Sequence, residues 1–555
     1  MSIQTYYSDT VIIGAGIAGI TCALELLDAG QTVILVDRQA LSAHGGLAKE
    51  SFGGINIIDS PIQRWNGIKD SPELAYEDWC HFAEFDAYDC WPRAWARFYT
   101  EASRPYLYDW LRAKGIPFFP IVHWVERGLF KPGNSVPRFH MVWGTGKALI
   151  DQLWQHLFQH KHRDKLHLLF EHTVQRLLME EHRMVGCLGH DSDGRAFEIL
   201  SDTCVIASGG FGGNLDWVRS HWDKELSPPP HYVLNGSDLS ADGSLHAEAA
   251  RHGAMLTHLE HQWIYAAGVH HPRPRHPHHG LSLIPPHSAL WVNAKGERFG
   301  PMPLVTSFDN RFLVSTICHQ EKAYSWQIMN LKIAERELAV SGADYNDDIR
   351  DKNFFGFLRT VLLGNKKMLR ELMETCQDFV VANDLEDLVT RMNALNGDQQ
   401  VSFETLRHEI LQYDRMIDRG PQFFNDEQLR RIAQLRNYRG DRVRTCRFQK
   451  ILDPKAGPLL AIREFILSRK SLGGLQTNLY SQALDSYGEP IGGLYAIGEA
   501  AGFGGGGIHG KRALEGTFLG SCILTARCAA RHIGRGTHLG SELLTYVLPP
   551  PDLTL

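Results

Sequence analysis

Three glycines near the start of the chain stand where a nucleotide-binding turn would need them. Residues 10–13 form a short β-branched run, Gly14, Gly16 and Gly19 follow at once, and apolar residues then recur at helical spacing. In such a turn the first glycine permits a sharp bend, the second lets the backbone approach a pyrophosphate, and the third lets helix pack closely on strand. This order of strand, glycine turn and helix predicts a site for the phosphates of a dinucleotide.

An acidic residue at the end of the next β-branched run completes the pattern. Residues 32–36 lead to Asp37, which stands at the distance expected of a carboxylate that binds an adenosine ribose hydroxyl. Arg38 beside it could instead indicate a 2′-phosphate and hence NADP, but the acid keeps its usual position. We therefore expect Asp37 to contact the ribose.

The composition is that of an ordinary globular protein. The 555 residues carry a formal net charge of −6, with 43% hydrophobic and 22% charged residues, which excludes intrinsic disorder and a small disulfide scaffold. The mild acidity argues against nucleic acid or an anionic membrane as the main partner. The ten cysteines form no C-x-x-C pair and suit a reducing compartment. With no signal-peptide pattern and no apolar run of about 20 residues, we expect a cytoplasmic protein without a membrane span.

Four separated segments are similar to those of a known flavoprotein superfamily. They are the glycine turn at 14–19, HGGLAKESFGGI at 44–55, CVIASGGFGGN at 204–214 and GLYAIGEAAGFGGGGIHG at 493–510. In these segments the chain resembles the fumarate reductase/succinate dehydrogenase flavoprotein superfamily, which includes the 3-ketosteroid dehydrogenases.

The resemblance implies an α/β fold in which a Rossmann-like FAD-binding domain of the glutathione-reductase type carries an inserted α+β capping domain. It places the first part of the FAD-binding domain at residues 1–257, with a helical insertion at about 61–140. The capping domain would span 258–440, the second part of the FAD-binding domain 441–540, and a C-terminal tail 541–555. The aromatic residues of the insertion are expected to be core, and Asn383 is expected to cap a helix in the cap.

The resemblance also implies FAD as the cofactor. Its attachment histidine in succinate dehydrogenases falls on Leu47, so we expect noncovalent FAD, with His44 as a weaker alternative attachment point. Glu499 would contact the ribityl chain, and the helix that begins at Thr517 would direct its N-terminus at the pyrimidine edge of the flavin. The expected cofactor-binding residues are Gly14, Gly16, Ala18, Gly19, Asp37, Arg38, Gly45, Gly46, Ser51, Gly53, Gly54, Val174, Ala207, Ser208, Gly209, Glu499, Gly516, Thr517 and Leu519.

Four residues are candidates for catalysis by the same resemblance. Tyr265 occupies the position of a substrate-binding histidine, Lys470 that of a second one, and His509 matches the family's His-Gly pair. Arg512 lies one residue before the position of a dicarboxylate-binding arginine, which falls on Ala513. A packing role for the tyrosine and a solvated lysine are the alternatives for the first two.

The substrate positions depart from both known branches. The proton-relay carboxylate of fumarate reductases falls on Met302, Arg311 is the nearest candidate for the relay arginine, and the tyrosine of the steroid enzymes' last glycine loop falls on Phe503. Fumarate is therefore an unfavourable substrate, whereas an apolar residue at position 503 suits a hydrophobic, ketosteroid-like one.

These features predict an FAD-dependent oxidoreductase that acts on a CH–CH bond next to a carbonyl, with hydride exchanged with flavin N5. The alternatives are a flavin oxidase of an amine or hydroxyl group and a non-catalytic flavin-binding or electron-carrying protein. The expected partners are a small-molecule substrate and an unidentified electron acceptor or donor, and no nucleic acid. The histidine-rich residues 270–279 are interrupted by prolines and hold no acid or cysteine, so we predict no metal site there.

Overall fold

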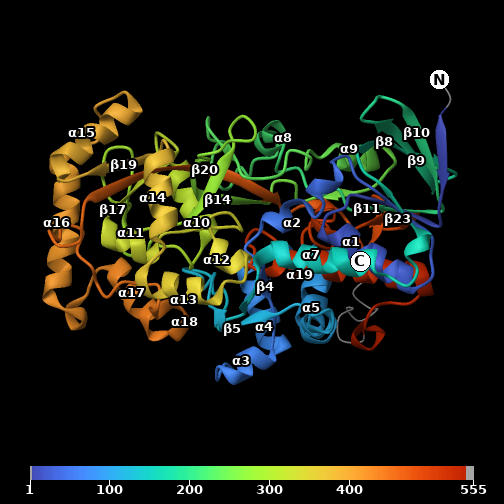
Figure 1. The fold of residues 1–555 in the computed structure, drawn as a ribbon, viewed down its shortest axis with the longest axis horizontal. Helices are drawn as coiled ribbons and strands as arrows, with labels where there is room; N and C mark the ends of the chain where they lie inside the picture. The colour runs from blue at the N-terminus through green and yellow to red at the C-terminus, as the bar shows by residue number, and fades with distance from the viewer. Residues whose placement is uncertain (1–2, 545–555) are drawn as a thin grey trace. The chain divides into compact units, whose positions relative to one another are not determined.

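The computed structural model describes residues 3–544 (Figure 1). Most of the predicted tail, residues 545–555, lies outside the described residues. The chain divides into two compact units. The first comprises Met1–Trp222, Ser237–Trp263 and Lys470–Leu555, and the second comprises Asp223–Gly236 and Ile264–Arg469.

The first unit is built on a ten-stranded sheet, and its central strands are the β-branched runs of the sequence. The buried strands β2 (Thr10–Ile13), β3 (Val33–Val36) and β11 (Thr203–Ile206) pair in parallel, with Thr10 beside Val33 and Thr203. Side chains buried on both faces are what a parallel sheet requires. The order along the sheet is β1-β10-β9-β23-β11-β2-β3-β7, with β22 on β23 and β8 on β9. The predicted Rossmann-like α/β fold is confirmed.

Helices α1 (Ile17–Asp28) and α19 (Thr517–Arg535) pack on each other in this unit. Both are almost wholly buried along their first turns. The remaining elements of the unit complete its sheets and surface. They are β1 (Gln4–Tyr7), α2 (Gly46–Glu50), β4 (Gly54–Asn56), α7 (Thr145–Phe158), β7 (Leu166–Leu169), β8 (His172–Glu180), β9 (Arg183–Asp191), β10 (Ala196–Leu200), α8 (Leu215–Ser220), α9 (Ser244–Arg251), β13 (Leu256–Thr257), β21 (Gly474–Leu475), β22 (Gln482–Leu484) and β23 (Pro490–Ala496).

The segment predicted as a helical insertion, residues 61–140, is helical only in its first part. Its helices are α3 (Pro61–Trp65), α4 (Pro72–Ala83), α5 (Cys90–Ala102) and α6 (Asp109–Ala113). It then forms strands β5 (Phe118–His123) and β6 (Phe139–Val142), which join β4 in a three-stranded sheet.

The aromatic residues of the insertion are split between core and surface. Trp79, Trp95 and Tyr99 are buried, as the sequence predicts, whereas Trp65 and Tyr88 are exposed. The buried three are among the largest fully enclosed side chains of the described residues, so they fix the insertion onto the unit.

The second unit is built on an eight-stranded sheet of order β16-β17-β20-β14-β15-β18, with β12 and β19 also on β20. Its strands are β12 (Leu234–Asn235), β14 (Gln262–His270), β15 (Gly280–Ile284), β16 (Leu290–Val292), β17 (Tyr324–Asn330), β18 (Ala339–Val340), β19 (Phe379–Ala382) and β20 (Leu459–Ser471). Its helices are α10 (Asn310–Cys318), α11 (Leu331–Glu337), α12 (Asp347–Arg350), α13 (Phe354–Leu363), α14 (Lys366–Thr375), α15 (Leu385–Asn396), α16 (Phe403–Arg419), α17 (Glu427–Asn437) and α18 (Arg439–Arg442).

The compact units divide the chain at other places than the predicted domains. The second unit continues to Arg469, whereas the sequence predicts a return to the FAD-binding domain at residue 441. The long strand β20 is the reason, because it lies in the middle of the second unit's sheet, between β17 and β14.

One helix cap differs from its prediction by one residue. Helix α15 begins at Leu385, and Asp384 rather than Asn383 is its N-cap, with the carboxylate accepting from the Asp387 N–H at 2.9 Å. The expectation for Asn383 is therefore wrong. Aspartate and asparagine cap helices about equally well, so composition alone does not decide between these neighbours.

No helix among residues 3–544 is long and apolar enough to cross a membrane.

Glu464→Gln is expected to stabilise the protein at alkaline pH. Glu464 on β20 is fully buried, and burial raises its pKa well above the ordinary value, although a hydrogen bond with the side chain of Gln327 opposes that shift. Because the folded-state pKa is raised, ionising this group costs stability, and the cost grows as the pH rises above about 4.3. The variant should gain about 2 kcal/mol in unfolding free energy at pH 8 and almost nothing at pH 4.

Thermal unfolding across this pH range measures the effect, with the exposed Glu404→Gln as the control. Equal melting temperatures of Glu464→Gln and wild type at pH 8 would show that the buried carboxyl costs nothing.

Candidate flavin site

The glycine turn is held so tightly that side chains are excluded at two of its positions. Gly14 has φ +114°, and a Cβ on it would lie 2.4 Å from the carbonyl oxygen of Ala207. A Cβ on Gly19 would lie 1.9 Å from the carbonyl oxygen of Gly14. The turn therefore joins β2, α1 and the end of β11 at backbone distance, as the sequence pattern predicts.

Gly16 differs from its two neighbours, because a Cβ there would meet no heavy atom within 4 Å. It is the N-cap of α1, with φ −73° and ψ −178°, and no side chain caps the helix. Ala18 and Gly19 follow in the first turn, where backbone N–H groups lack helical partners. An open backbone surface at a helix N-terminus fits the pyrophosphate of FAD.

The second motif lies against this turn. The N–H of Gly45 donates to the carbonyl oxygen of Ala15 at 2.9 Å, and Gly16 and Gly45 form an isolated parallel bridge. Gly46 begins α2, which also contains Leu47.

Close backbone packing continues to the end of this motif. Ser51 accepts at its carbonyl oxygen from the Gly146 N–H at 3.0 Å. A Cβ on Gly53 would lie 2.7 Å from the carbonyl carbon of Thr145, and one on Gly54 would strike the Phe139 ring. The residues 44–55 are therefore fixed by α7 and β6.

Asp37 is placed at the end of β3 and is bound to backbone. One carboxylate oxygen accepts from the Ala15 N–H at 2.6 Å and the other from the Gln39 N–H at 2.8 Å, while burial raises its pKa. Arg38 lies apart from this contact, since its guanidinium forms an ion pair with Asp242 at 2.7 Å.

The third and fourth motifs meet around Glu499. Its Oε1 accepts from the N–H of Ser471 at 2.9 Å and from the Ser471 hydroxyl at 3.2 Å. A Cβ on Gly210 would lie 2.3 Å from that same carboxylate oxygen, so a larger residue there would displace the Glu499 carboxylate. The serine was not found from the sequence, because nothing local marks it as the partner of a residue 28 positions away.

The other predicted cofactor residues of this unit lie near strand ends and at one helix start. Ala207 follows β11, and its N–H donates to the carbonyl oxygen of Ile13 at 2.8 Å. Ser208 and Gly209 come next, and Val174 is buried within β8. Gly516 is the N-cap of α19, whose first turn holds Thr517 and Leu519.

His509 is fully buried and uncharged. Its Nε2 lies 2.7 Å from the hydroxyl of Thr517, and that hydroxyl donates its one proton to the carbonyl oxygen of Leu514 at 2.7 Å. The imidazole must therefore donate at Nε2, which leaves Nδ1 as a bare acceptor. Burial, with the nearby charge of Lys470, lowers the pKa of His509 to about 3.

Aromatic rings surround this imidazole. Ring centroids of Phe518, Phe503 and Trp79 lie 4.9, 5.2 and 5.9 Å from that of His509, and Trp263 lies 5.7 Å from Phe518. The ammonium of Lys470 is 4.3 Å from the centre of the Phe518 ring. The start of α19 therefore combines an apolar wall with one cation. The sequence had singled out neither tryptophan for this site.

The position of the dicarboxylate-binding arginine lacks a charge. Ala513 is completely buried, and the neighbouring Arg512 forms an ion pair with Glu84. Lys131 also lies 2.9 Å from that carboxylate. Arg512 is thus engaged in a surface network of the insertion.

The remaining candidates belong to the second unit. Tyr265 is half-buried on β14, with the Arg469 guanidinium 5.9 Å from its ring centre. Arg311 is paired with Asp223 at 2.6 Å. Met302 contacts the buried guanidinium of Arg431, so a thioether stands where the relay carboxylate was sought.

A histidine pair that the sequence did not reveal lies beside the last glycine loop. His258 Nε2 is 2.8 Å from an Asp89 carboxylate oxygen, and its ring stacks on His261. Burial alone would lower the pKa of His258, but the Asp89 carboxylate outweighs it, so that the pKa is raised. A Cβ on Gly507 would touch the His258 ring. The insertion is thereby tied to the loop by a charged hydrogen bond.

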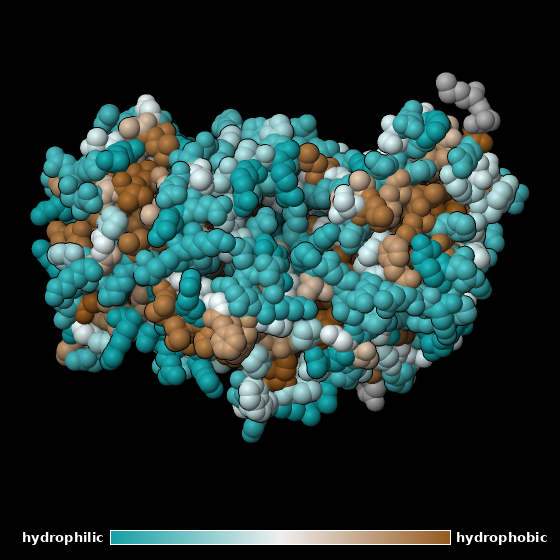
Figure 2. Space-filling model, in the orientation of Figure 1, coloured by the Kyte–Doolittle hydropathy of each residue, from teal (hydrophilic) through white to brown (hydrophobic). Residues whose placement is uncertain are grey.

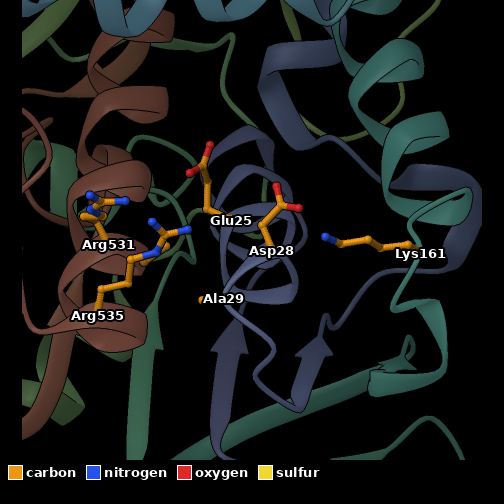
Figure 3. A pocket seen from close by; sticks show the side chains of 7 residues that line it. Glu25, Asp28, Ala29, Lys161, Arg531 and Arg535 are labelled. Atoms are coloured by element: carbon orange, nitrogen blue, oxygen red, sulfur yellow. The ribbon is translucent and has the colours of Figure 1, made fainter.

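A pocket of about 250 Å³ lies at the opposite end of α1 from the glycine turn (Figure 3). Its lining residues are Glu25, Asp28, Ala29, Lys161, Ala530, Arg531 and Arg535. The twelve residues of α1, about 18 Å of helix, separate this pocket from the helix end at the glycine turn. The cations that line the pocket complement the negative C-terminal ends of α1 and α19. No group of three or more His, Cys, Asp or Glu side chains within residues 3–544 is arranged to hold a metal ion.

Comparisons with known proteins agree with this geometry. The model of the FAD binding domain family matches residues 9–519. A KsdD-like steroid dehydrogenase of Mycobacterium tuberculosis is 39% identical over 547 residues, covering 94% of this chain and 95% of that protein.

Two solved structures share the fold. A 3-ketosteroid delta1-dehydrogenase from Sterolibacterium denitrificans, in complex with 1,4-androstadiene-3,17-dione, has a TM-score of 0.70 at 16% identity and covers 96% of this chain and 100% of that one. The open conformation of a flavocytochrome c3 fumarate reductase has a TM-score of 0.66 at 20% identity and covers 96% and 79%. The superfamily resemblance predicted from four segments is confirmed.

Proposed function

The chain belongs to the FAD binding domain family, and from that premise we propose that it is a dehydrogenase of hydrophobic, ketosteroid-like substrates. It is an FAD-dependent oxidoreductase that acts on CH–CH donors. The observation that carries the finer proposal is the aromatic wall at the start of α19, where Phe503, Phe518 and Trp79 enclose a neutral His509. These side chains are buried, and the apolar environment that they create beside the start of α19 suits an apolar ring system.

Missing charges support the same choice over a dicarboxylate. Ala513 is buried and apolar, Arg512 is bound to Glu84, and Met302 contacts an arginine. A site for fumarate or succinate would need cations to bind two carboxylates. The steroid name of the 39% identical relative points in the same direction.

The cofactor contacts follow from the glycine turn. We propose that the open backbone at Gly16 and the first turn of α1 bind the pyrophosphate, that Asp37 binds the ribose and that Glu499 binds the ribityl chain. The N-terminus of α19, at Gly516 and Thr517, would stabilise negative charge on the flavin pyrimidine. When bound, FAD supplies the hydride acceptor.

The protein's own groups then have separate tasks. The Lys470 ammonium stabilises the enolate-like oxygen that develops when a hydrogen next to the carbonyl leaves as a proton. Tyr265 is our candidate for accepting that proton, which it can do as the phenolate, becoming the neutral phenol. His509, whose N–H is bound to Thr517, is too weak a base at a pKa of about 3 and positions the start of α19.

Acid precipitation is expected to release the flavin. Leu47 stands at the family's attachment position, and the alternative His44 has its ring stacked on Trp154 at 4.5 Å with Nδ1 bound to the carbonyl oxygen of Leu41. The flavin absorbance of the purified protein should therefore move entirely to the acid supernatant. Absorbance that stays with the pellet would contradict noncovalent binding.

Anaerobic addition of a 3-ketosteroid is expected to bleach the flavin absorbance near completely, whereas succinate at the same concentration leaves it unchanged. Apolar contact favours the first compound, and the missing carboxylate-binding cations disfavour the second. Stopped-flow absorbance measures both. Bleaching by succinate alone would overturn the substrate proposal, and peroxide released from an amine or alcohol would favour the oxidase alternative.

A further inference from the structure

Helix α13 presents an apolar surface that no other part of residues 3–544 covers. None of its ten residues is buried, and Phe354, Phe355, Leu358, Leu362 and Leu363 are exposed, Phe355 to 83%. Figure 2 shows apolar residues gathered where Figure 1 places α13. Exposed apolar residues that are contiguous, unlike scattered ones, mark a site of interaction.

Four of the five exposed apolar side chains lie on one side of the helix, and Leu363 lies about 80° beyond Phe355. At about 100° per residue, Phe354, Leu358, Leu362 and Phe355 fall within an arc of about 100°. Arg359 lies about 40° beyond the edge of that arc. An apolar stripe edged by a cation is the pattern of a helix that lies in a lipid interface.

Basic residues frame the stripe at both ends. Residues 347–367 contain five basic against three acidic side chains, whereas the whole chain has a net charge of −6. Lys352 and Arg359 form no ion pair among the described residues, and the exposed Lys366 and Lys367 pair with the partly exposed Glu335 and the exposed Asp347 at 3.6 and 2.7 Å. Exposed pairs contribute little, so these cations remain available to an anionic surface.

We propose that α13 docks this protein on the surface of an anionic lipid bilayer, with the apolar stripe in the headgroup region and the cations against lipid phosphates. A helix of ten residues is about 15 Å long, half the hydrocarbon thickness, so it lies on the bilayer and does not span it. The net negative charge of the whole chain does not prevent this docking, because the net charge of residues 347–367 is positive.

The charge argues against a second copy as the occupant. Two like-charged α13 surfaces would repel each other. Five exposed apolar side chains on one helix are also far fewer than the roughly 20–30 residues a side of a stable interface. The inference needs no knowledge of the substrate, and its test is independent of activity.

Cosedimentation of the FAD-loaded full chain with phosphatidylcholine vesicles, with and without phosphatidylglycerol, tests the proposal. The protein should bind the anionic vesicles and release in high salt. The double variant Phe355→Ser,Leu362→Ser should bind the anionic vesicles at least about 10-fold more weakly than wild type. The double variant Lys366→Glu,Lys367→Glu should lose the preference for phosphatidylglycerol.

Tyr487→Ser is the matched control, because Tyr487 is 89% exposed but stands between Asp485 and Glu489; it should bind like wild type. Flavin content and turnover of dissolved substrate should be unchanged in all variants. Absence of vesicle binding, equal binding by Phe355→Ser,Leu362→Ser, or equal binding to uncharged vesicles would overturn the proposal. Sedimentation velocity that shows a dimer lost in the serine variant would assign the surface to a second copy instead.

Discussion

Replacing Lys470 with methionine is expected to lower the rate of flavin reduction by a 3-ketosteroid about 100-fold while FAD stays bound. The ammonium lies 4.3 Å from the Phe518 ring centre and close enough to His509 to help lower the pKa of that imidazole. Removing one group that stabilises a developing oxyanion costs about 10²–10³ in rate. Methionine keeps the approximate length of the side chain and removes its charge together with its N–H donors.

Anaerobic stopped-flow absorbance measures this rate, and the flavin spectrum reports cofactor content. Lys470→Arg should recover part of the rate because it restores the charge. Lys455→Met, at an exposed lysine of the second unit, should behave like wild type. Full activity in Lys470→Met would show that this lysine has no role in the reaction and only packs on the Phe518 ring.

The elements that the sequence predicted well are those fixed by local pattern. Strands β2 and β3 and helix α1 were visible because apolar periodicity and glycine placement act within a few residues. The family's departures at Phe503 and Ala513 could also be read locally, since both stand inside recognisable motifs. Their burial gives the proposed preference for an apolar substrate its physical basis.

Other features depend on contacts between distant segments, and the sequence does not encode those visibly. Ser471 meets Glu499, Asp89 meets His258, and Trp79 reaches His509 across more than 400 residues. The tautomer of His509 follows only from the double role of the Thr517 hydroxyl. Each of these is a tertiary consequence of strand order and insertion packing, so a motif search misses it.

The compact units end at other residues than the predicted domains for a related reason. The composition of a segment indicates where a strand begins and ends, but the sheet to which the strand belongs depends on which other strands it pairs with. Strand β20 pairs with β17 through Leu459 to Phe465 and so stays with the second unit. The prediction at residue 441 followed the family's chain order and had no information on this pairing.

Gly16→Val is expected to abolish FAD binding, raising the dissociation constant at least about 100-fold, while the apoprotein folds normally. The backbone at Gly16 has φ −73° and ψ −178°, which valine adopts without strain, and no protein atom lies within 4 Å of the added Cβ. The added Cβ therefore has room in the protein itself, and the branched side chain would occupy the space of a pyrophosphate that approaches the helix N-terminus. About 2.7 kcal/mol of lost affinity corresponds to that factor.

Gly19→Ala provides the contrast, because its Cβ would lie 1.9 Å from the Gly14 carbonyl oxygen and should lower the melting temperature of the apoprotein itself. Titration of apoprotein with FAD, followed by flavin fluorescence, gives the affinity, and thermal unfolding without FAD gives the stability. Gly16→Ala should fall between wild type and valine in affinity because its side chain is smaller. If Gly16→Val retains wild-type affinity, the pyrophosphate does not lie over this turn, and the open surface at Gly16 would lose its assignment even though the family relationship stands.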